Sequence, residues 1–108
     1  MDKKSLTAVA RQQLKLAATA SSGRSSQTLY GGHAHSLRQT VIALTAGHSL
    51  AEHDTPGEAT LQVLTGTLTV LSGANEWKGS PGDLLVLPGA RHSVKAIDDV
   101  AFLLTVAM

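Results

Sequence analysis

The sequence predicts an all-β domain, a sandwich or a barrel, preceded by one N-terminal α-helix. Short runs of β-prone residues follow one another from residue 37 to the end of the chain, and glycine-rich turns separate several of them. Apolar residues at helical spacing occur only before residue 21. Because no helices alternate with the strands, a sandwich or barrel is favoured over a parallel α/β arrangement.

The expected helix begins at a cap on Ser5 and ends near Ala20. Its weak apolar stripe uses spacings of three and four residues and consists of Leu6, Val9, Ala10, Leu14, Ala17 and Ala18. Ser21-Ser22-Gly23 ends the helix, and the SSGRSSQ segment is expected to be a flexible connector. We therefore divide the chain into a helix and connector, residues 1–27, and a β-domain, residues 28–108.

Six runs are expected to form the strands: LRQTVIALTAG, ATLQVLTG, TLTVLSG, DLLVLPG, HSVKAI and VAFLLTVAM. The segments 72–75 and 79–82 are turn sequences between them. A chain of 108 residues has room for one domain and one core. Aromatic residues make up only 3% of the chain, so Leu, Val, Ile and Ala must build most of that core. Trp77 is expected to pack against a sheet or against the helix.

Composition narrows the functional classes. The chain has no cysteine, which excludes a disulfide framework and a thiolate metal site. Residues 1–50 carry six basic residues and one acidic residue, whereas residues 51–108 carry three basic and seven acidic ones. The basic arm could contact nucleic acid, its own body or a second subunit. We expect no nucleic acid, because the arm has no interleaved aromatic residues and one helix leaves no room for a helix-turn-helix.

The first thirty residues do not resemble a membrane or export segment. No apolar run approaches the roughly 20 residues of a membrane span. Arg11, Gln12, Gln13 and Lys15 interrupt the continuous apolar region that a secretory leader needs. A structural helix fits this composition better than an Arg-rich organellar leader. We expect a cytoplasmic protein without a membrane partner.

Two glycine-anchored segments carry the strongest functional information: GHSLAEHDTPGEATLQVLTG and GDLLVLPGARH. Each places a histidine at a fixed offset from a turn glycine, between short apolar runs. This arrangement predicts an imidazole-lined pocket within the β-domain.

The two segments resemble the paired motifs of the cupin superfamily. In the first, Gly47 precedes His53 at the motif spacing and Gly66 matches the closing turn; in the second, Gly82 and Pro88 match, and His92 comes one residue early. The resemblance covers residues 36–107. It implies a double-stranded β-helix, the cupin jelly-roll barrel, over residues 28–108, usually as a homodimer.

Several positions depart from the metal-binding pattern of that family. Thr55 occupies the place of the second histidine, Ala59 that of the glutamate, and Ala96 stands near the place of the motif's asparagine. The resemblance therefore leaves His53 and His92 pointing into the barrel mouth. A catalytic divalent ion normally takes three protein donors, so two imidazoles give a weaker and less defined site.

Glu58 is a candidate for the missing donor. With His53 and His92 it could complete a two-histidine, one-carboxylate triad of the type used by non-haem iron. It lies beside the matching position, however, and neighbouring residues of a strand point to opposite faces. A bulge after Pro56-Gly57 would be needed to turn Glu58 inward.

The remaining polar residues have more ordinary interpretations. His48 directly follows a turn glycine and is expected to face solvent, as are His33 and His35 beside a glycine hinge. Gln39 and Gln62 could donate hydrogen bonds into a pocket or across a subunit boundary. Arg91 could contact an anionic ligand, although a solvated strand residue is the preferred interpretation.

Three functional hypotheses remain. The first is a small-molecule-binding barrel with a partly lost metal site, whose ligand contacts His53, His92, Thr55 and Gln62. The alternative is a metal-dependent enzyme, dioxygenase- or isomerase-like, in which His53, His92 and Glu58 hold one divalent Fe, Mn, Zn or Ni ion. The third is a structural or regulatory protein whose basic arm contacts another chain.

A homodimer is expected on physical grounds as well. The open edges of the sheets and the apolar C-terminal run VAFLLTV need cover, and a second subunit can supply it.

Overall fold

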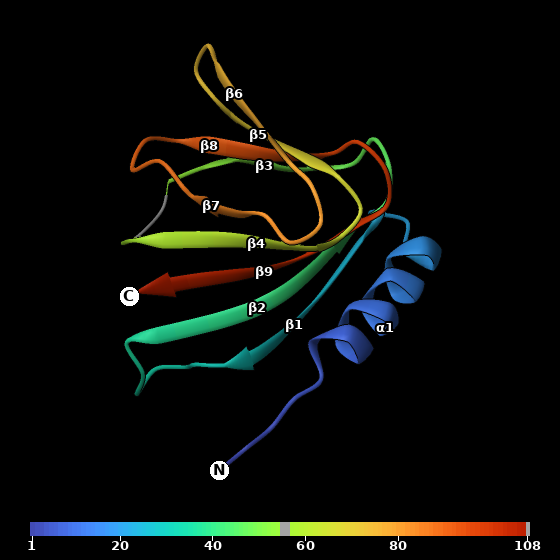
Figure 1. Ribbon diagram of the computed structural model, residues 1–108, viewed down its shortest axis with the longest axis vertical. Helices are drawn as coiled ribbons and strands as arrows, with labels where there is room; N and C mark the ends of the chain where they lie inside the picture. Colours follow the sequence, from blue (N-terminus) through green and yellow to red (C-terminus); the bar gives the residue numbers. More distant parts are fainter. Residues whose placement is uncertain (55–56, 108) are drawn as a thin grey trace.

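The computed structural model describes residues 1–54 and 57–107, apart from the side chain of His53. In this part of the chain one helix precedes nine strands (Figure 1). Their bounds are α1 (Leu6–Thr19), β1 (Arg24–Tyr30), β2 (Leu37–Leu44), β3 (Ser49–His53), β4 (Ala59–Thr65), β5 (Leu68–Ser72), β6 (Asn75–Gly79), β7 (Leu84–Val86), β8 (His92–Ala96) and β9 (Val100–Ala107).

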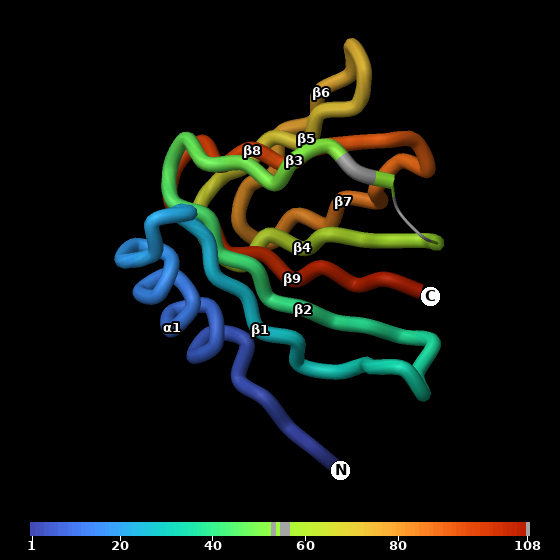
Figure 2. Tube along the Cα trace, turned by 180° about the vertical axis from the view of Figure 1, so that it is seen from behind, coloured from blue at the N-terminus to red at the C-terminus, as the bar shows by residue number. Residues whose placement is uncertain are grey.

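The strands form two antiparallel sheets that face each other (Figures 1 and 2). The large sheet has the strand order β1-β2-β9-β4-β7, and the small sheet has the order β3-β8-β5-β6. The expected all-β jelly roll with one N-terminal helix is confirmed. The described strands of the two sheets do not join into one closed ladder, because β6 and β7 remain edge strands along one seam.

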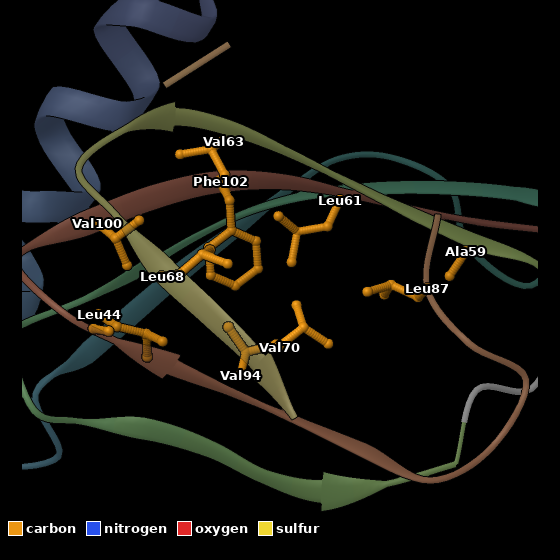
Figure 3. Close-up of a cluster of buried hydrophobic side chains, with 11 residues drawn as sticks. Leu44, Ala59, Leu61, Val63, Leu68, Val70, Leu87, Val94, Val100 and Phe102 are labelled. Atoms are coloured by element: carbon orange, nitrogen blue, oxygen red, sulfur yellow. The ribbon is translucent and has the colours of Figure 1, made fainter. Parts of the chain in front are cut away.

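The main core fills the space between the sheets (Figure 3). Phe102 of β9 is its largest fully buried side chain. Around Phe102 lie aliphatic residues from both sheets, so the core agrees with the composition: Leu44, Leu61, Val63, Leu68, Val70, Val94 and Val100. Burial of one such side chain stabilises the fold by about 1.5–3 kcal/mol.

A second, smaller core joins α1 to the outer face of the large sheet. Ala10 and Ala17 of the helix pack against Ala43 of β2 and Ala101 of β9. The Ser5 side chain caps the helix by accepting a hydrogen bond from the backbone N–H of Ala8. Small side chains on both elements let the helix approach the sheet closely. No described helix is both long enough and apolar enough to cross a membrane.

Residues 24–27 were expected to belong to a flexible connector, but this expectation is wrong. They form the start of β1 and pair with β2. The reason is a polar tertiary contact that sequence patterns do not reveal. The buried Gln13 side chain donates to Gln27 Oε1 at 3.3 Å and accepts a hydrogen bond from the Ser25 hydroxyl. The polar side chains of this segment therefore find their hydrogen-bond partner on the helix, which holds the segment in place as a strand.

Two adjacent aspartates hold the turns at one end of the sandwich, which we call the closed end. Asp98 accepts a hydrogen bond from Thr67 N in the β4–β5 turn at 2.6 Å. Asp99 accepts one from Ala46 N in the β2–β3 turn at 2.9 Å. Gly66 lies so close to the Asp99 carbonyl that any Cβ would collide with it. Three connections are thereby fixed at one end, and the functional candidates lie at the other.

Gly23 and Gly47 form a matched pair for testing how closely the turn after α1 packs against the β2–β3 turn at this end. Both have positive φ, +68° and +83°, where a side chain costs roughly 1–2 kcal/mol. A Cβ on Gly47 would meet open space, whereas a Cβ on Gly23 would collide with the His48 ring. We therefore expect Gly23→Ala to lower the free energy of unfolding by about twice as much as Gly47→Ala, measured by urea denaturation. In a His48→Ala background the two losses should become similar; equal losses in the wild-type background would contradict this account.

Asp98 should make the free energy of unfolding depend on pH in the acid range. Its pKa is lowered, first by the backbone hydrogen bond from Thr67. A carboxyl whose pKa is depressed on folding stabilises the fold above its unfolded pKa of about 3.9, and this contribution is lost as the pH falls through the folded pKa. Carbon-detected NMR titration should therefore place the Asp98 midpoint below about 3.9. Asp98→Asn should flatten the acid dependence of unfolding in that range, and an unchanged profile would contradict the assignment.

Candidate functional site

The two histidines of the paired segments meet at the open end of the sandwich. His53 is the last residue of β3 and His92 is the first residue of β8. The antiparallel register places the two residues directly opposite each other, after an irregularity between Leu50 and His53. Directly opposed residues of an antiparallel pair belong to the same face of the sheet. The expected juxtaposition of these two positions is therefore present in the backbone.

His92 lies on the inner face of the small sheet. Its side chain is 1% exposed, and the alternation along β8 puts it on the same face as Val94 and Ala96 of the main core. Its Nδ1 lies 3.2 Å from the carbonyl oxygen of Ala90. In the tautomer that forms this hydrogen bond, Nδ1–H donates and Nε2 carries the lone pair of the ring. A buried imidazole on this inner face can contribute polar contacts in an otherwise apolar core.

Arg91 connects the two strands on the side of this pair that faces solvent. Its Nε lies 3.2 Å from Glu52 Oε1, and an Nη donates to the Glu52 carbonyl oxygen at 3.3 Å. A second Nη lies 3.7 Å from a carboxylate oxygen of Asp54. Glu52 and Asp54 flank His53 in sequence. One guanidinium therefore contacts the residues on both sides of His53. Arg91 is a solvated side chain, as expected, and its contacts also position the backbone on both sides of His53.

The other predicted site residues lie apart from this pair. Ala59 is buried on the inner face of β4, whereas Glu58 just before it is exposed. The Glu58 carbonyl oxygen accepts a hydrogen bond from Ala107 N at 2.9 Å, which fixes the backbone beside the end of β9. Gln62 is exposed on the outer face of the large sheet. Thr55 lies outside the described residues.

The remaining histidines are exposed, as the sequence predicts. His48 forms a 2.8 Å hydrogen bond through Nδ1 with the Thr45 hydroxyl. His35 makes an edge-on ring contact with Tyr30, with centroids 4.9 Å apart. His33 lies in the same turn and is also exposed. These three histidines therefore lie on the surface, away from the His53–His92 pair.

A hollow of about 400 Å³ opens along the seam between β6 and β7. Trp77 forms part of its wall, and the core residues Val70 and Leu87 form part of its floor. Trp77 stands opposite Val70, which stands opposite Val94, so the three form one inner-face row across the small sheet. His92 belongs to the next row, two residues along β8. The hollow therefore borders the inner-face row next to that of the histidine pair.

Known structures identify this architecture. No protein-family model and no curated protein matches the sequence. An RmlC-like cupin protein from Desulfovibrio desulfuricans superposes with a TM-score of 0.74 at 21% identity, over 99% of this chain and 96% of that one. This chain has the cupin fold.

Two further structures share the cupin fold. A conserved protein of unknown function from Streptococcus pyogenes has a TM-score of 0.73 and 26% identity, over 82% of this chain and 76% of that chain. A mutant form of salicylate 1,2-dioxygenase from Pseudoaminobacter salicylatoxidans has a TM-score of 0.73 and 23% identity. That match covers 92% of this chain but only 32% of the dioxygenase chain. The cupin fold thus serves an enzyme as well as small single-domain proteins.

The side chains of this cupin domain offer a metal ion few donors. Among the side chains that the structure describes, which do not include that of His53, no group of three or more His, Asp or Glu is arranged to hold a metal ion. Ala59 offers no donor at the inner-face position of β4, and the Glu58 side chain is exposed. Two imidazoles fall short of the three protein donors of a catalytic site. The described donor set does not fit a resident metal ion.

Sequence reasoning missed the Arg91 contacts and the part that Trp77 plays in the hollow. The signal for the first was present, because Arg91 adjoins His92 while acidic residues adjoin His53, and pairing the histidines brings these charges together. Trp77 takes the first of its two expected positions, against a sheet, but it lies 43% exposed at the free edge of the small sheet. Its place along the seam follows only from the unjoined edges of β6 and β7.

The positioning role of Arg91, which immediately precedes β8, is testable with a charge-matched variant within β8. Arg91→Gln should accelerate backbone hydrogen exchange in residues 52–54 at least several-fold, because it removes all three contacts. Its effect on global stability should stay within about 1 kcal/mol, since exposed ion pairs contribute little. Lys95→Gln removes the same charge from an exposed position of β8 and should leave exchange at residues 52–54 unchanged. Equal exchange rates in the two variants would contradict the positioning role.

Proposed function

We propose that this cupin domain binds a small molecule between its sheets, with His53 and His92 as the recognition groups. The observation that supports the proposal most is the buried imidazole of His92 on the inner face, directly opposed in register by a second histidine. The core around it is apolar, built of aliphatic side chains and Phe102.

The chemistry of the surroundings narrows the ligand class. An imidazole ring nitrogen accepts a hydrogen bond when it carries the lone pair and donates one when it carries a hydrogen. A hydroxyl or carboxyl group satisfies either state. The hollow along the seam has mixed walls, with Val70, Trp77 and Leu87 as apolar members and Lys78 and Asp83 as charged ones. The ligand we propose therefore combines one hydroxyl or carboxyl group with a small apolar body.

Thermal unfolding with a panel of small hydroxy acids, oxo acids and phenols tests this proposal. A compound at one hundred times its dissociation constant should add about 2.7 kcal/mol of stability, which is roughly a 10 °C rise in Tm for a domain of this size. The rise should disappear in His92→Asn and in His53→Asn. It should persist in His48→Asn, which alters an exposed imidazole. A panel without any stabilising compound, or a rise that persists in both site variants, would overturn the proposal.

A metal-dependent reaction is the alternative, and the dioxygenase with the same fold is the reason to test it. Elemental analysis of untagged protein, incubated with iron, manganese, zinc or nickel salts and then desalted, measures the metal content directly. Because the described donors are too few, we expect far less than one metal ion per chain. About one ion per chain, lost in the His53→Asn, His92→Asn double variant, would replace the binding proposal with the metal-dependent one.

A further inference from the structure

We propose that the free edge of β1, together with the flank of α1 beside it, binds an extended acidic peptide segment of another protein, which adds a strand to the large sheet. The proposal is independent of the ligand between the sheets and of the histidine pair. It rests on the exposed backbone of an edge strand, on apolar side chains of the helix next to that edge, and on the charge of the part of the chain that builds both.

β1 is the outermost strand of the large sheet on one side. Among the described strands it pairs only with β2, so alternate backbone N–H and carbonyl groups along its other edge point away from the sheet (Figure 1). β1 is seven residues long, whereas the other described edge strands, β3, β6 and β7, have five, five and three residues. It contains neither the proline nor the lysine that often blocks an edge. Such an edge can template an extended peptide.

Hydrogen bonds identify the flank of α1 that lies toward this edge. Gln13 of the helix contacts Ser25 and Gln27 of β1. On the other flank of the helix, Leu14 lines a hollow together with Leu64 of β4. The sheet order runs from β1 through β2 and β9 to β4, so the flank opposite Leu14 faces the free edge of β1 (Figures 1 and 2).

That flank carries apolar side chains. With about 3.6 residues per turn, Val9 and Leu16 are two turns apart and share one side of the helix, on the far side of Gln13 from Leu14. Val9 is half-buried, whereas Leu16 is 48% exposed. Neighbouring strands lie about 4.8 Å apart, so a strand added to β1 would lie next to this flank. Its side chains on the helix side would cover Leu16, and apolar ones fit that position best.

The side of β1 that faces away from the helix is polar and basic. Ser25 and Gln27 contact the helix, so alternation turns Arg24 and Thr28 to the opposite side. Thr28 is paired with β2 in a register that places Arg38 on this side as well. Both arginines are exposed, and neither forms an ion pair with another residue that the structure describes. Acidic side chains of an added strand would meet them here.

The β1 edge belongs entirely to the basic part of the chain. Residues 1–50, which include α1, β1 and β2, carry six basic residues and one acidic residue. A partner of opposite charge is therefore favoured. A peptide with alternating apolar and acidic side chains matches the helix flank on one side of the edge and the arginines on the other. The β1 edge of a second copy fits less well, because it would bring two basic surfaces together.

Fluorescence anisotropy of labelled synthetic peptides, titrated with the full chain, tests the proposal. The probe is a peptide of alternating valine and glutamate residues with the length of β1, seven residues. We expect a dissociation constant below about 100 µM. A valine–lysine peptide should bind at least about tenfold more weakly, because its charge is reversed. The valine–glutamate peptide methylated on its backbone nitrogens should lose affinity to a similar degree, about tenfold, because it cannot donate ladder hydrogen bonds.

One substitution on each side of the edge identifies the residues involved. Arg24→Glu should weaken binding of the valine–glutamate peptide several-fold and strengthen binding of the valine–lysine peptide. Leu16→Asp should weaken the first peptide several-fold by placing a charge on the helix flank. Lys95→Glu and Ile97→Asp make the same changes at exposed positions in and after β8, and they should leave the affinity unchanged. Circular dichroism melting verifies that each variant is folded.

Backbone hydrogen exchange locates the bound peptide. Binding should slow exchange at alternate amides of residues 24–30 and leave the edges of β3, β6 and β7 unchanged. The proposal is overturned if the wild-type chain does not bind the valine–glutamate peptide at about 100 µM, or if all three peptides bind equally. Slowed exchange at a different edge overturns it as well. So does sedimentation velocity that shows a dimer in which the amides of residues 24–30 are already protected without peptide, because a second copy then occupies the edge.

Discussion

The rest of the structure depends on the alternation of side-chain size along β9. This strand is central in the large sheet, and it buries residues on both faces. Val100 and Phe102 enter the core between the sheets, while Ala101 lies under α1. A slip of one residue would exchange the two sets, driving Phe102 against the helix and leaving an alanine in the core. The order Val100-Ala101-Phe102, with its large residues inward and its alanine under the helix, thus fixes the register and the position of α1.

The sequence was a good guide wherever side chains alternate strongly or a cap is explicit. The helix begins and ends within one residue of its expected bounds, and the runs that contain β2, β4, β5, β7, β8 and β9 were predicted. β1 was interpreted as a connector because Arg24, Ser25 and Gln27 lack apolar alternation. β3 and β6 escaped for the same reason, since SLAEH and NEWKG carry few buried side chains. These strands are stabilised by pairing with neighbours that are distant in sequence, which a local pattern does not record.

The candidate site was predictable in its centre and not in its surroundings. Glycine spacing identified His53 and His92 as partners, and the register of β3 and β8 places them opposite each other. Gln62 shows the limit of such reasoning, because the sequence cannot say which face of a strand a polar residue occupies; the pairing of β4 with β9 puts it outside. The Arg91 contacts and the hollow along the seam are consequences of how two edges meet. They require the three-dimensional arrangement.

The seam between β6 and β7 also bears on how the molecule avoids growing into fibres. An open edge with exposed backbone donors can add a strand from another chain. β7, however, is only three residues long and lies between Pro81 and Pro88, neither of which has an N–H to offer. An incoming strand would find too short a ladder to hold. The β7 edge can therefore border the hollow without offering a long template for strand addition.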